Sequence, residues 1–345
     1  MKFSLFAHME RIDSDQSHAQ LYEEFIALCE IADAGGIHTI WTGEHHAMDF
    51  TIAPNPFITI VDLARRTKNV RLGTGTVVAP FWHPIKLAGE AAMTDVISNG
   101  RLELGLARGA YSFEYERMRP GLDATSAGLR LREMVPAIKQ LWAGNYVHDG
   151  AFHQFPLSSS SPKPLQDGGP PIWIAARDQA SHDFALANGC NVQVTPLSQG
   201  DGEIEALMQR FTKACSEVTD AKRPKIMLLQ HAYIASDADD VVRGANALSR
   251  FYCHFGAWFK NERPVSQALI QPLSEAEMAA MAHFAPDKML ENLAIGTPKT
   301  VVERLKAYEQ LGYDEYAYWI DCGMPFAAKK ASLERFIGEV IPAFT

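Results

Sequence analysis

The stretch Lys2-Phe3-Ser4-Leu5-Phe6-Ala7-His8-Met9-Glu10 decides between two folds for this 345-residue chain. Its first five residues predict a strand, and no glycine follows that strand directly. A doubly wound sheet that binds a dinucleotide usually carries a glycine-rich loop after its first strand. The stretch therefore favours the other fold in which parallel strands alternate with helices, the (β/α)8 barrel.

The remainder of the chain supplies the eight strands and helices that such a barrel needs. Short runs rich in β-branched and aromatic residues predict strands at Lys2–Phe6, Thr39–Thr42, Val70–Val78, Leu102–Leu106, Ile172–Ala175, Asn191–Val194, Lys225–Ala235 and Glu315–Ile320. Helical patterns predict Leu21–Ala34, Pro56–Arg66, Pro84–Ile97, Gly128–Trp142, Ala180–Ala187, Glu203–Glu217, Asp237–Phe255, Pro298–Leu311 and Lys329–Ile341. We expect one barrel domain over residues 1–345, with the doubly wound sheet as the alternative.

Two segments interrupt the alternation of strands and helices. Residues Asn145–Phe155 alternate polar and apolar side chains around Asp149-Gly150, which predicts a hairpin inserted after the fourth helix. Residues Asn261–Pro286 form a long segment beyond the seventh strand. A loop of that length in a compact domain is typical of a lid, and in a barrel it would cover the active face.

Composition excludes several classes of partner. Lys and Arg number 32 and Asp and Glu 41, which gives a net charge of −9. Nucleic acids and anionic membranes bind basic faces, so this charge argues against both partners. The amino-terminal apolar run is too short for a signal peptide, and no stretch approaches the roughly 18 apolar residues of a membrane span. The five cysteines are scattered without a CxxC pair, as expected of reduced thiols in the cytoplasm.

The residues just beyond the carboxyl ends of barrel strands normally form the active site. Glu44-His45-His46 follows the second predicted strand. Imidazole is the side chain best suited to exchange a proton near neutral pH, which makes a histidine here a candidate acid or base. The alternative is a structural histidine held by a carboxylate. A hydrolytic metal site is disfavoured, because the chain contains no His-x-His sequence.

Two further strand ends predict an anion site. Arg108 is followed by Gly109, and a guanidinium beside a glycine is suited to a phosphate that comes close to the backbone. Arg177-Asp178-Gln179-Ala180-Ser181 leads into a helix, whose first-turn amides and Ser181 hydroxyl are candidate anion donors. The alternatives are a surface salt bridge for Arg108 and simple helix capping by Asp178 or Ser181.

Several stretches together resemble the bacterial luciferase-like, flavin-dependent monooxygenases. They follow the family's order over nearly the whole chain, and their combination is specific although each piece alone is weak. The similar stretches are Met1–Phe6, Ile40–His46, Asn69–Pro84, Asn99–Leu102, Gly105–Tyr111, Pro170–Gly189 and Gly296–Pro298.

The resemblance implies a (β/α)8 barrel that binds reduced FMN, which reacts with O2 to a C4a-peroxide. It places His45 beside the flavin as the catalytic histidine, with Glu44 nearby, and it places Gly75 and Thr76 under the isoalloxazine ring. The residues implied at the phosphate or elsewhere on the cofactor are Arg108, Gly109, Ala110, Arg130, Arg177 and Ser181.

Two positions depart from the family pattern. Asp178 stands where a small or hydroxyl residue is frequent, and a carboxylate beside a phosphate is unfavourable unless it turns away or pairs with Arg177. Ala107 stands at the position of the reactive cysteine of the luciferases, so we expect no light emission.

The resemblance also implies partners. No GxGxxG element follows a predicted strand, so a separate NAD(P)H-flavin reductase is expected to supply the reduced FMN. The family further implies a homodimer. Two alternatives stay open: an oxidoreductase of the same fold that uses a deazaflavin as hydride carrier, and a non-catalytic flavin-binding subunit.

Aromatic residues near the predicted active end point to the small organic substrate. They are Trp41, Phe81, Trp82, Tyr111, Trp258, Phe259 and Trp319, among which Trp82, Tyr111 and Trp258 are the predicted substrate contacts. Stacking and cation–π contacts would suit a flat aromatic or cationic ring. Within the family, Gly43–Phe50, Phe81–Pro84 and Ala110–Tyr115 are most similar to oxygenases that open an N-methylpyridinium ring such as that of trigonelline.

Overall fold

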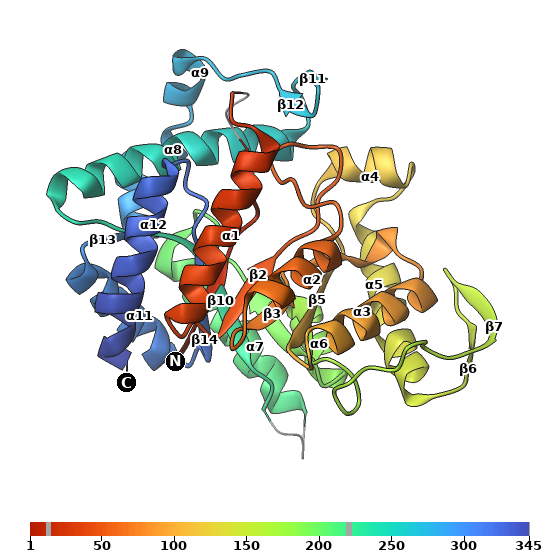
Figure 1. Cartoon of the computed structure of the whole chain (residues 1–345). Coiled ribbons are helices and arrows are strands. Elements are labelled where there is room, and N and C mark those ends of the chain that lie inside the picture. Colours follow the sequence, from red (N-terminus) through yellow and green to blue (C-terminus); the bar gives the residue numbers. More distant parts are fainter. Residues whose placement is uncertain (12–14, 219–222, 345) are drawn as a thin grey trace.

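The computed structural model describes residues 1–11, 15–218 and 223–344. Within these residues, eight parallel strands close into a barrel with helices outside it (Figure 1). The strands are β1 (Lys2–Phe6), β2 (Thr39–Thr42), β3 (Arg71–Thr74), β5 (Leu102–Ala107), β8 (Ile172–Ala175), β9 (Asn191–Val194), β10 (Ile226–Ile234) and β14 (Glu315–Trp319). Each pairs with the next, β14 pairs with β1, and the β9–β10 ladder completes the ring. The (β/α)8 barrel predicted from the sequence is confirmed.

The outer helices follow the predicted order. They are α1 (His18–Ala34), α2 (Pro56–Arg66), α3 (Pro84–Ile97), α5 (Ala124–Ala143), α6 (Gln179–Ala187), α7 (Gly200–Glu217), α8 (Ala238–Lys260), α11 (Pro298–Leu311) and α12 (Phe326–Arg335). Side-chain caps set several starts: Asp123 accepts the Ser126 amide, so α5 begins four residues earlier than predicted. At the carboxyl terminus one helix over Lys329–Ile341 was expected, but α12 ends at Arg335. The chain continues as a π-helical turn over Phe336–Val340 and a 3-10 turn over Ile341–Phe344.

The predicted strand Val70–Val78 is interrupted. It forms β3 and the short β4 (Val77–Val78), with Gly75 and Thr76 between them. The Gly75 amide donates to the Thr42 carbonyl at 2.7 Å, which turns the chain toward β2. A Cβ on Gly75 would lie 2.7 Å from the Phe6 ring, so a side chain there would collide with β1. The sequence did not predict β13 (Ala294–Gly296), which pairs in parallel with the last residues of β10, Ala232 to Ile234.

The two interruptions contain secondary structure of their own. Strands β6 (Tyr146–Asp149) and β7 (Gln154–Ser158) pair antiparallel and project beyond α5 (Figure 1). The segment after α8 carries the short pair β11 (Val265–Ser266) and β12 (Leu269–Ile270), then α9 (Glu275–Ala280) and α10 (Pro286–Asn292). The Asp49 amide donates to the Ala268 carbonyl at 2.8 Å, which ties this segment to the loop after β2. A lid function for the segment stays a prediction.

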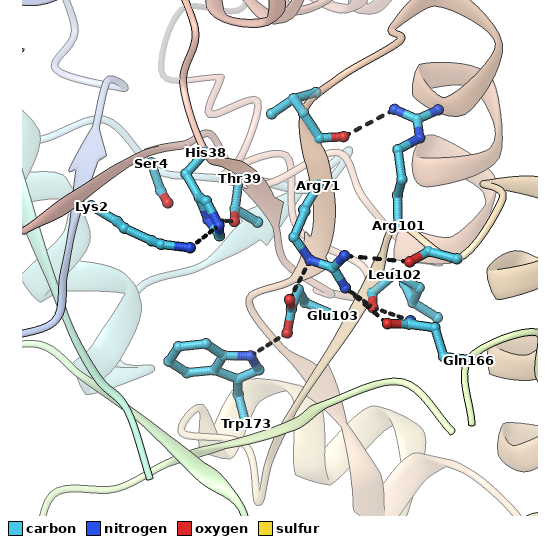
Figure 2. Close-up of polar contacts among 12 residues, drawn as sticks. Lys2, Ser4, His38, Thr39, Arg71, Arg101, Leu102, Glu103, Gln166 and Trp173 are labelled. Carbon is cyan, nitrogen blue, oxygen red and sulfur yellow. Dashed lines mark hydrogen bonds and ion pairs between the residues drawn. The ribbon is translucent and has the colours of Figure 1, made fainter. Parts of the chain in front are cut away.

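The amino ends of the strands are closed by a polar layer (Figure 2). Arg71 pairs with Glu103, and the other Glu103 oxygen accepts the Trp173 indole N–H at 2.7 Å. A second buried carboxylate, Glu315, accepts from Ser4 and from Trp41. Burial raises the pKa of Glu315 above its ordinary value despite these hydrogen bonds. Such a layer at the amino end of a barrel serves stability, because the chemistry of this fold takes place at the other end.

The chain termini meet outside this amino end. The Phe3 ring packs edge-on against Phe344 at 4.9 Å, so the last described turn covers the first strand. No helix in the described ranges is long and apolar enough to cross a membrane.

Candidate active site

A cavity of about 720 Å³ opens at the carboxyl ends of the barrel strands. Residues that follow or end different strands line it, as the barrel geometry requires. The predicted site residues on its wall are Glu44, His45, Gly75, Thr76, Arg108, Gly109, Ala110, Tyr111, Arg177 and Ser181. Three predicted residues, Trp82, Arg130 and Trp258, are not part of the wall.

His45 is held by a carboxylate from a distant part of the chain. Its Nδ1 lies 3.1 Å from Glu114 Oε2, and the other Glu114 oxygen accepts the His46 amide at 2.7 Å. Glu114 lies on the short helix α4 (Ser112–Met118) and is 1% exposed. An ionised carboxylate requires the proton of a neutral His45 to sit on Nδ1, so Nε2 keeps the lone pair that can exchange a proton.

The Glu44 carboxylate is occupied by hydrogen bonds to the protein itself. Its carboxylate accepts the Val78 amide at 2.8 Å and the Trp82 indole N–H at 2.9 Å, and it lies 2.6 Å from His46 Nε2. Both oxygens are therefore engaged in joining the loops after β2 and β4. Trp82 was predicted to contact substrate, but its indole nitrogen points to Glu44 and its ring packs edge-on against Phe57.

Three arginines border one side of the cavity: Arg108, Arg132 and Arg177. Neither Arg108 nor Arg132 forms an ion pair within 4.0 Å among the described residues, whereas Arg177 Nε lies 3.6 Å from Glu203. Two guanidinium groups without a carboxylate partner on a cavity wall are suited to bind an anion. The Arg130 guanidinium, predicted as a cofactor contact, lies 4.4 Å from the Phe152 ring and is not on the cavity wall.

The start of α6 is capped by a side chain rather than left open. Asp178 Oδ1 accepts both the Ser181 amide and the Ser181 hydroxyl, each at 2.8 Å. The capping alternative is thus what the structure contains, and both Ser181 donors are engaged. Partial burial acts to raise the pKa of Asp178, but the Ser181 hydrogen bonds and the charges of Arg132 and Arg108 hold it below its ordinary value.

Glycines let the backbone approach the cavity closely. Gly109 has a φ of +85°, and a Cβ there would lie 2.9 Å from Val78 and 3.0 Å from Tyr115. The Tyr115 hydroxyl donates to the Gly109 carbonyl at 2.8 Å and fixes this turn. A Cβ on Gly43 would lie 2.6 Å from His8 Nε2, so the His8 imidazole occupies the space of a side chain at position 43.

Aromatic side chains also line the cavity. We call Tyr111, Phe255, Phe259 and Trp319 the aromatic wall; all four line the cavity. Tyr111 packs 4.6 Å from Phe259, which is 39% exposed, and 5.2 Å from the His45 ring. Trp258, one residue before Phe259, points the other way and packs 5.2 Å from Phe113.

Several residues of the site were missed by sequence reasoning. They are Glu114, Arg132 and Phe255. His8 stands two residues beyond the first strand, at a strand end where the sequence predicts site residues, and it lines the cavity. Glu114 carries no local signal, because its function depends on a partner 69 positions away.

The cavity fits a flat, phosphorylated cofactor such as a reduced flavin. Gly75, Gly109 and Ala110 bring backbone with little or no side chain to the cavity wall, and Arg108 and Arg132 supply positive charge there. In the described part of the chain no group of three His, Cys, Asp or Glu side chains is arranged to hold a metal ion.

Comparisons with known proteins agree with this geometry. The sequence model of the luciferase-like monooxygenases matches residues 1–315. The oxygenase component of the flavin-dependent trigonelline monooxygenase of Acinetobacter baylyi is 64% identical over 345 residues, which cover 100% of this chain and 96% of that protein.

Two solved structures share the fold. The oxygenating constituent of 3,6-diketocamphane monooxygenase from Pseudomonas putida, in complex with FMN, has a TM-score of 0.79 at 20% identity and covers 99% of this chain and 98% of its own. An F420-dependent secondary alcohol dehydrogenase has a TM-score of 0.77 at 16% identity. The match covers 100% of this chain and 99% of the dehydrogenase chain.

Proposed function

The chain belongs to the luciferase-like monooxygenase family and is a flavin-dependent monooxygenase; from this premise we propose that it is the oxygenase component of a two-component trigonelline monooxygenase. The observation that carries the proposal is the 64% identity to the Acinetobacter enzyme over the full length of the chain. The aromatic wall supports a flat ring as substrate, since Tyr111 and Trp319 offer aromatic faces for stacking.

The proposed cofactor is FMN. Arg108 and Arg132 would hold its phosphate, while Gly75 and Thr76 would support its ring, and the fit of the cavity to these groups is the supporting observation. When bound, the reduced flavin supplies the electrons that activate O2. A deazaflavin remains the alternative cofactor, because an F420-dependent enzyme shares the fold. Absorbance titrations with FMN and F420 distinguish the two.

The residues of the chain have three tasks in this proposal. His45, with Nδ1 held by Glu114, binds or releases a proton at Nε2 next to the reacting atoms. Glu44 fixes the loops that carry His45 and Thr76. The aromatic wall excludes water, which would otherwise quench the reactive oxygen species.

The proposed partners follow from the word component in the relative's name. A separate NAD(P)H-flavin reductase would deliver reduced FMN, and O2 and trigonelline would be the other reactants. We also propose that the whole chain acts as one unit in the cytoplasm and as a homodimer, to which the exposed Ile58 of α2 and Met93 and Val96 of α3 could contribute an apolar face.

The test is a reconstitution with the purified chain. With FMN, NADH, a flavin reductase and trigonelline, we expect substrate-dependent O2 consumption and an oxygenated product by mass spectrometry. Omitting the reductase should abolish turnover. Consumption of long-chain aldehydes but not of trigonelline would overturn the substrate assignment, and hydride transfer with reduced F420 in the absence of O2 would overturn the reaction class.

A further inference from the structure

A buried carboxyl group lies beside the aromatic wall without an ion-pair partner in the described part of the chain. Glu10 follows β1, and its side chain is 1% exposed. Neither of its oxygens has a hydrogen-bond partner within 3.5 Å among the described residues, and the Trp319 indole N–H is the side-chain donor that acts to lower its pKa. Burying a carboxyl group without partners costs free energy, so its persistence calls for an explanation.

Glu10 lies one side chain away from the cavity. Its Oε1 is 3.9 Å from His8 Nδ1, and His8 lines the cavity. Glu10 also acts on the aromatic wall: burial, Glu114 and Glu10 together raise the pKa of the Tyr111 hydroxyl. His8 itself stays neutral, since burial and the nearby His45 keep its pKa well below the ordinary value. The imidazole therefore does not neutralise a charge on Glu10.

Asp321 shows how a structural carboxylate at this depth is held. It accepts the His8 amide at 2.8 Å, and Lys329 Nζ lies 3.9 Å from it. Lys329 is thus used by Asp321 and forms no ion pair within 4.0 Å with Glu10. Within the described residues Glu10 lacks both kinds of support that Asp321 has. A purely structural function does not explain it.

We propose that Glu10 is the counter-charge for a cationic ring bound against the aromatic wall, and so determines the preference of the site for an N-alkylated pyridinium over a neutral pyridine. The inference rests on the proposed function, of which it names the specificity residue. Only one side chain would separate the Glu10 carboxylate from the bound cation. Because water is excluded from this site, the local dielectric constant is low and the attraction between the two charges is strong. The aromatic faces add cation–π attraction to the same charge.

Binding of the cation is then coupled to a proton. In the empty site burial and the Asp321 charge keep the pKa of Glu10 well above its ordinary value, which favours the protonated form. A bound cation favours the ionised form, and the proton leaves to solvent. The titratable groups that face Glu10 and share this balance are His8, Asp321, Lys329, Tyr111, Tyr252 and Cys322, and the Trp319 indole N–H favours the ionised carboxylate.

The experiment compares two ligands that differ by one methyl group and its charge. Trigonelline carries a fixed positive charge on its methylated ring nitrogen, and nicotinate has the same ring and carboxylate without it. Dissociation constants for both are measured by calorimetry with the FMN-loaded full chain. We expect wild type to bind trigonelline at least about tenfold more tightly than nicotinate. Glu10→Gln should reduce this ratio to near one, while Glu10→Asp retains part of it.

Glu303→Gln, an exposed glutamate on α11, is the matched control and should leave the ratio unchanged. FMN affinity reports whether each variant is folded. Calorimetry in two buffers of different ionisation enthalpy needs no variant: wild type should release a fraction of a proton with trigonelline and none with nicotinate. An unchanged ratio in Glu10→Gln, or no proton release by wild type, overturns the inference.

Failure of the inference and failure of the proposed function are distinguishable. If wild type prefers the methylated ring but does not oxygenate it, Glu10 keeps its function and trigonelline is not the substrate. If wild type and Glu10→Gln oxygenate trigonelline with the same KM, the proposed function stands and the counter-charge is wrong.

Discussion

The imidazole of His45 and the carboxylate of Glu114 lie 3.1 Å apart, although 69 positions separate them in the chain. The contact joins the loop after β2 to the short helix α4. It fixes both the orientation and the tautomer of the ring that faces the cavity. The site therefore depends on a residue outside the strand ends.

Replacing Glu114 by glutamine should impair turnover without impairing cofactor binding. The amide can still accept one hydrogen bond, but it no longer selects the Nδ1-protonated tautomer of His45. Loss of such a supporting carboxylate costs about 10- to 100-fold in activity. Steady-state oxygenation measures the loss, and flavin titration checks the cofactor. Glu116→Gln, an exposed neighbour on the same helix, should behave as wild type; equal losses in both variants would contradict the assignment.

Arg108→Gln should weaken FMN through its phosphate. A charge-assisted hydrogen bond contributes about 1.5–3 kcal/mol, which is roughly 10- to 150-fold in the dissociation constant. Riboflavin lacks the phosphate, so its weaker binding should not change. Fluorescence quenching of each flavin measures both constants. Arg130→Gln is the control, because Arg130 does not line the cavity, and it should leave FMN affinity near the wild-type value. An effect of Arg108→Gln on riboflavin would indicate misfolding instead.

Asp178→Asn should strengthen FMN binding. The substitution removes a negative charge that interacts with Arg108 and Arg132, and asparagine caps helices about as well as aspartate. An interaction of about 1 kcal/mol corresponds to roughly fivefold tighter binding. The effect should shrink at high salt, which screens charges near the surface. Weaker FMN binding by this variant would show that Asp178 contacts the cofactor favourably.

Arg71→Met should destabilise the barrel without touching the cavity. It leaves the buried Glu103 carboxylate without its ion-pair partner and with the Trp173 hydrogen bond alone (Figure 2), which costs about 3 kcal/mol. Lys330→Met removes an exposed pair with Glu334 on α12 and should cost about 0.3–0.5 kcal/mol. Urea unfolding of both variants measures the difference. Equal midpoints would mean that the polar layer contributes nothing to stability.

Glu10→Gln should be more stable than wild type at neutral and alkaline pH. Because the pKa of Glu10 is raised in the folded state, the native protein binds more protons than the unfolded chain above the ordinary value of 4.5. The free energy of unfolding of the wild type therefore falls as the pH rises through and above 4.5. The glutamine variant avoids that loss because its side chain does not ionise. Thermal unfolding between pH 4 and 8 should show curves that meet at the acidic end. A variant that is less stable at pH 8 would contradict this account.

The strands of the barrel could be predicted closely because their signal is local. β1, β2, β8 and β9 have the predicted bounds, since each is a short apolar run that ends at a change in composition. The break between β3 and β4 could not be predicted, because it depends on Phe6 of a neighbouring strand filling the space beside Gly75.

The site residues could be predicted where their position at a strand end is enough to bring the side chain to the cavity. They could not be predicted where the direction of the side chain decides whether it reaches the cavity. Arg108 and His45 follow strands and therefore reach the cavity. Arg130 and Arg132 lie on one helix two positions apart and face different ways, which only the docking of α5 determines. The sequence places Trp82 near the active end of the barrel, but it does not show which way the ring points. The buried indole N–H needs a hydrogen-bond acceptor, and Glu44 provides it.

The contact between Gly43 and His8 has an evolutionary consequence. The imidazole occupies the volume that a methyl group at position 43 would fill, so neither residue can change freely while the other is kept. A lineage that gains alanine at 43 must first lose or displace the histidine. Divergence at this end of the barrel should therefore proceed by paired replacements, and sequences that retain His8 should carry glycine at 43.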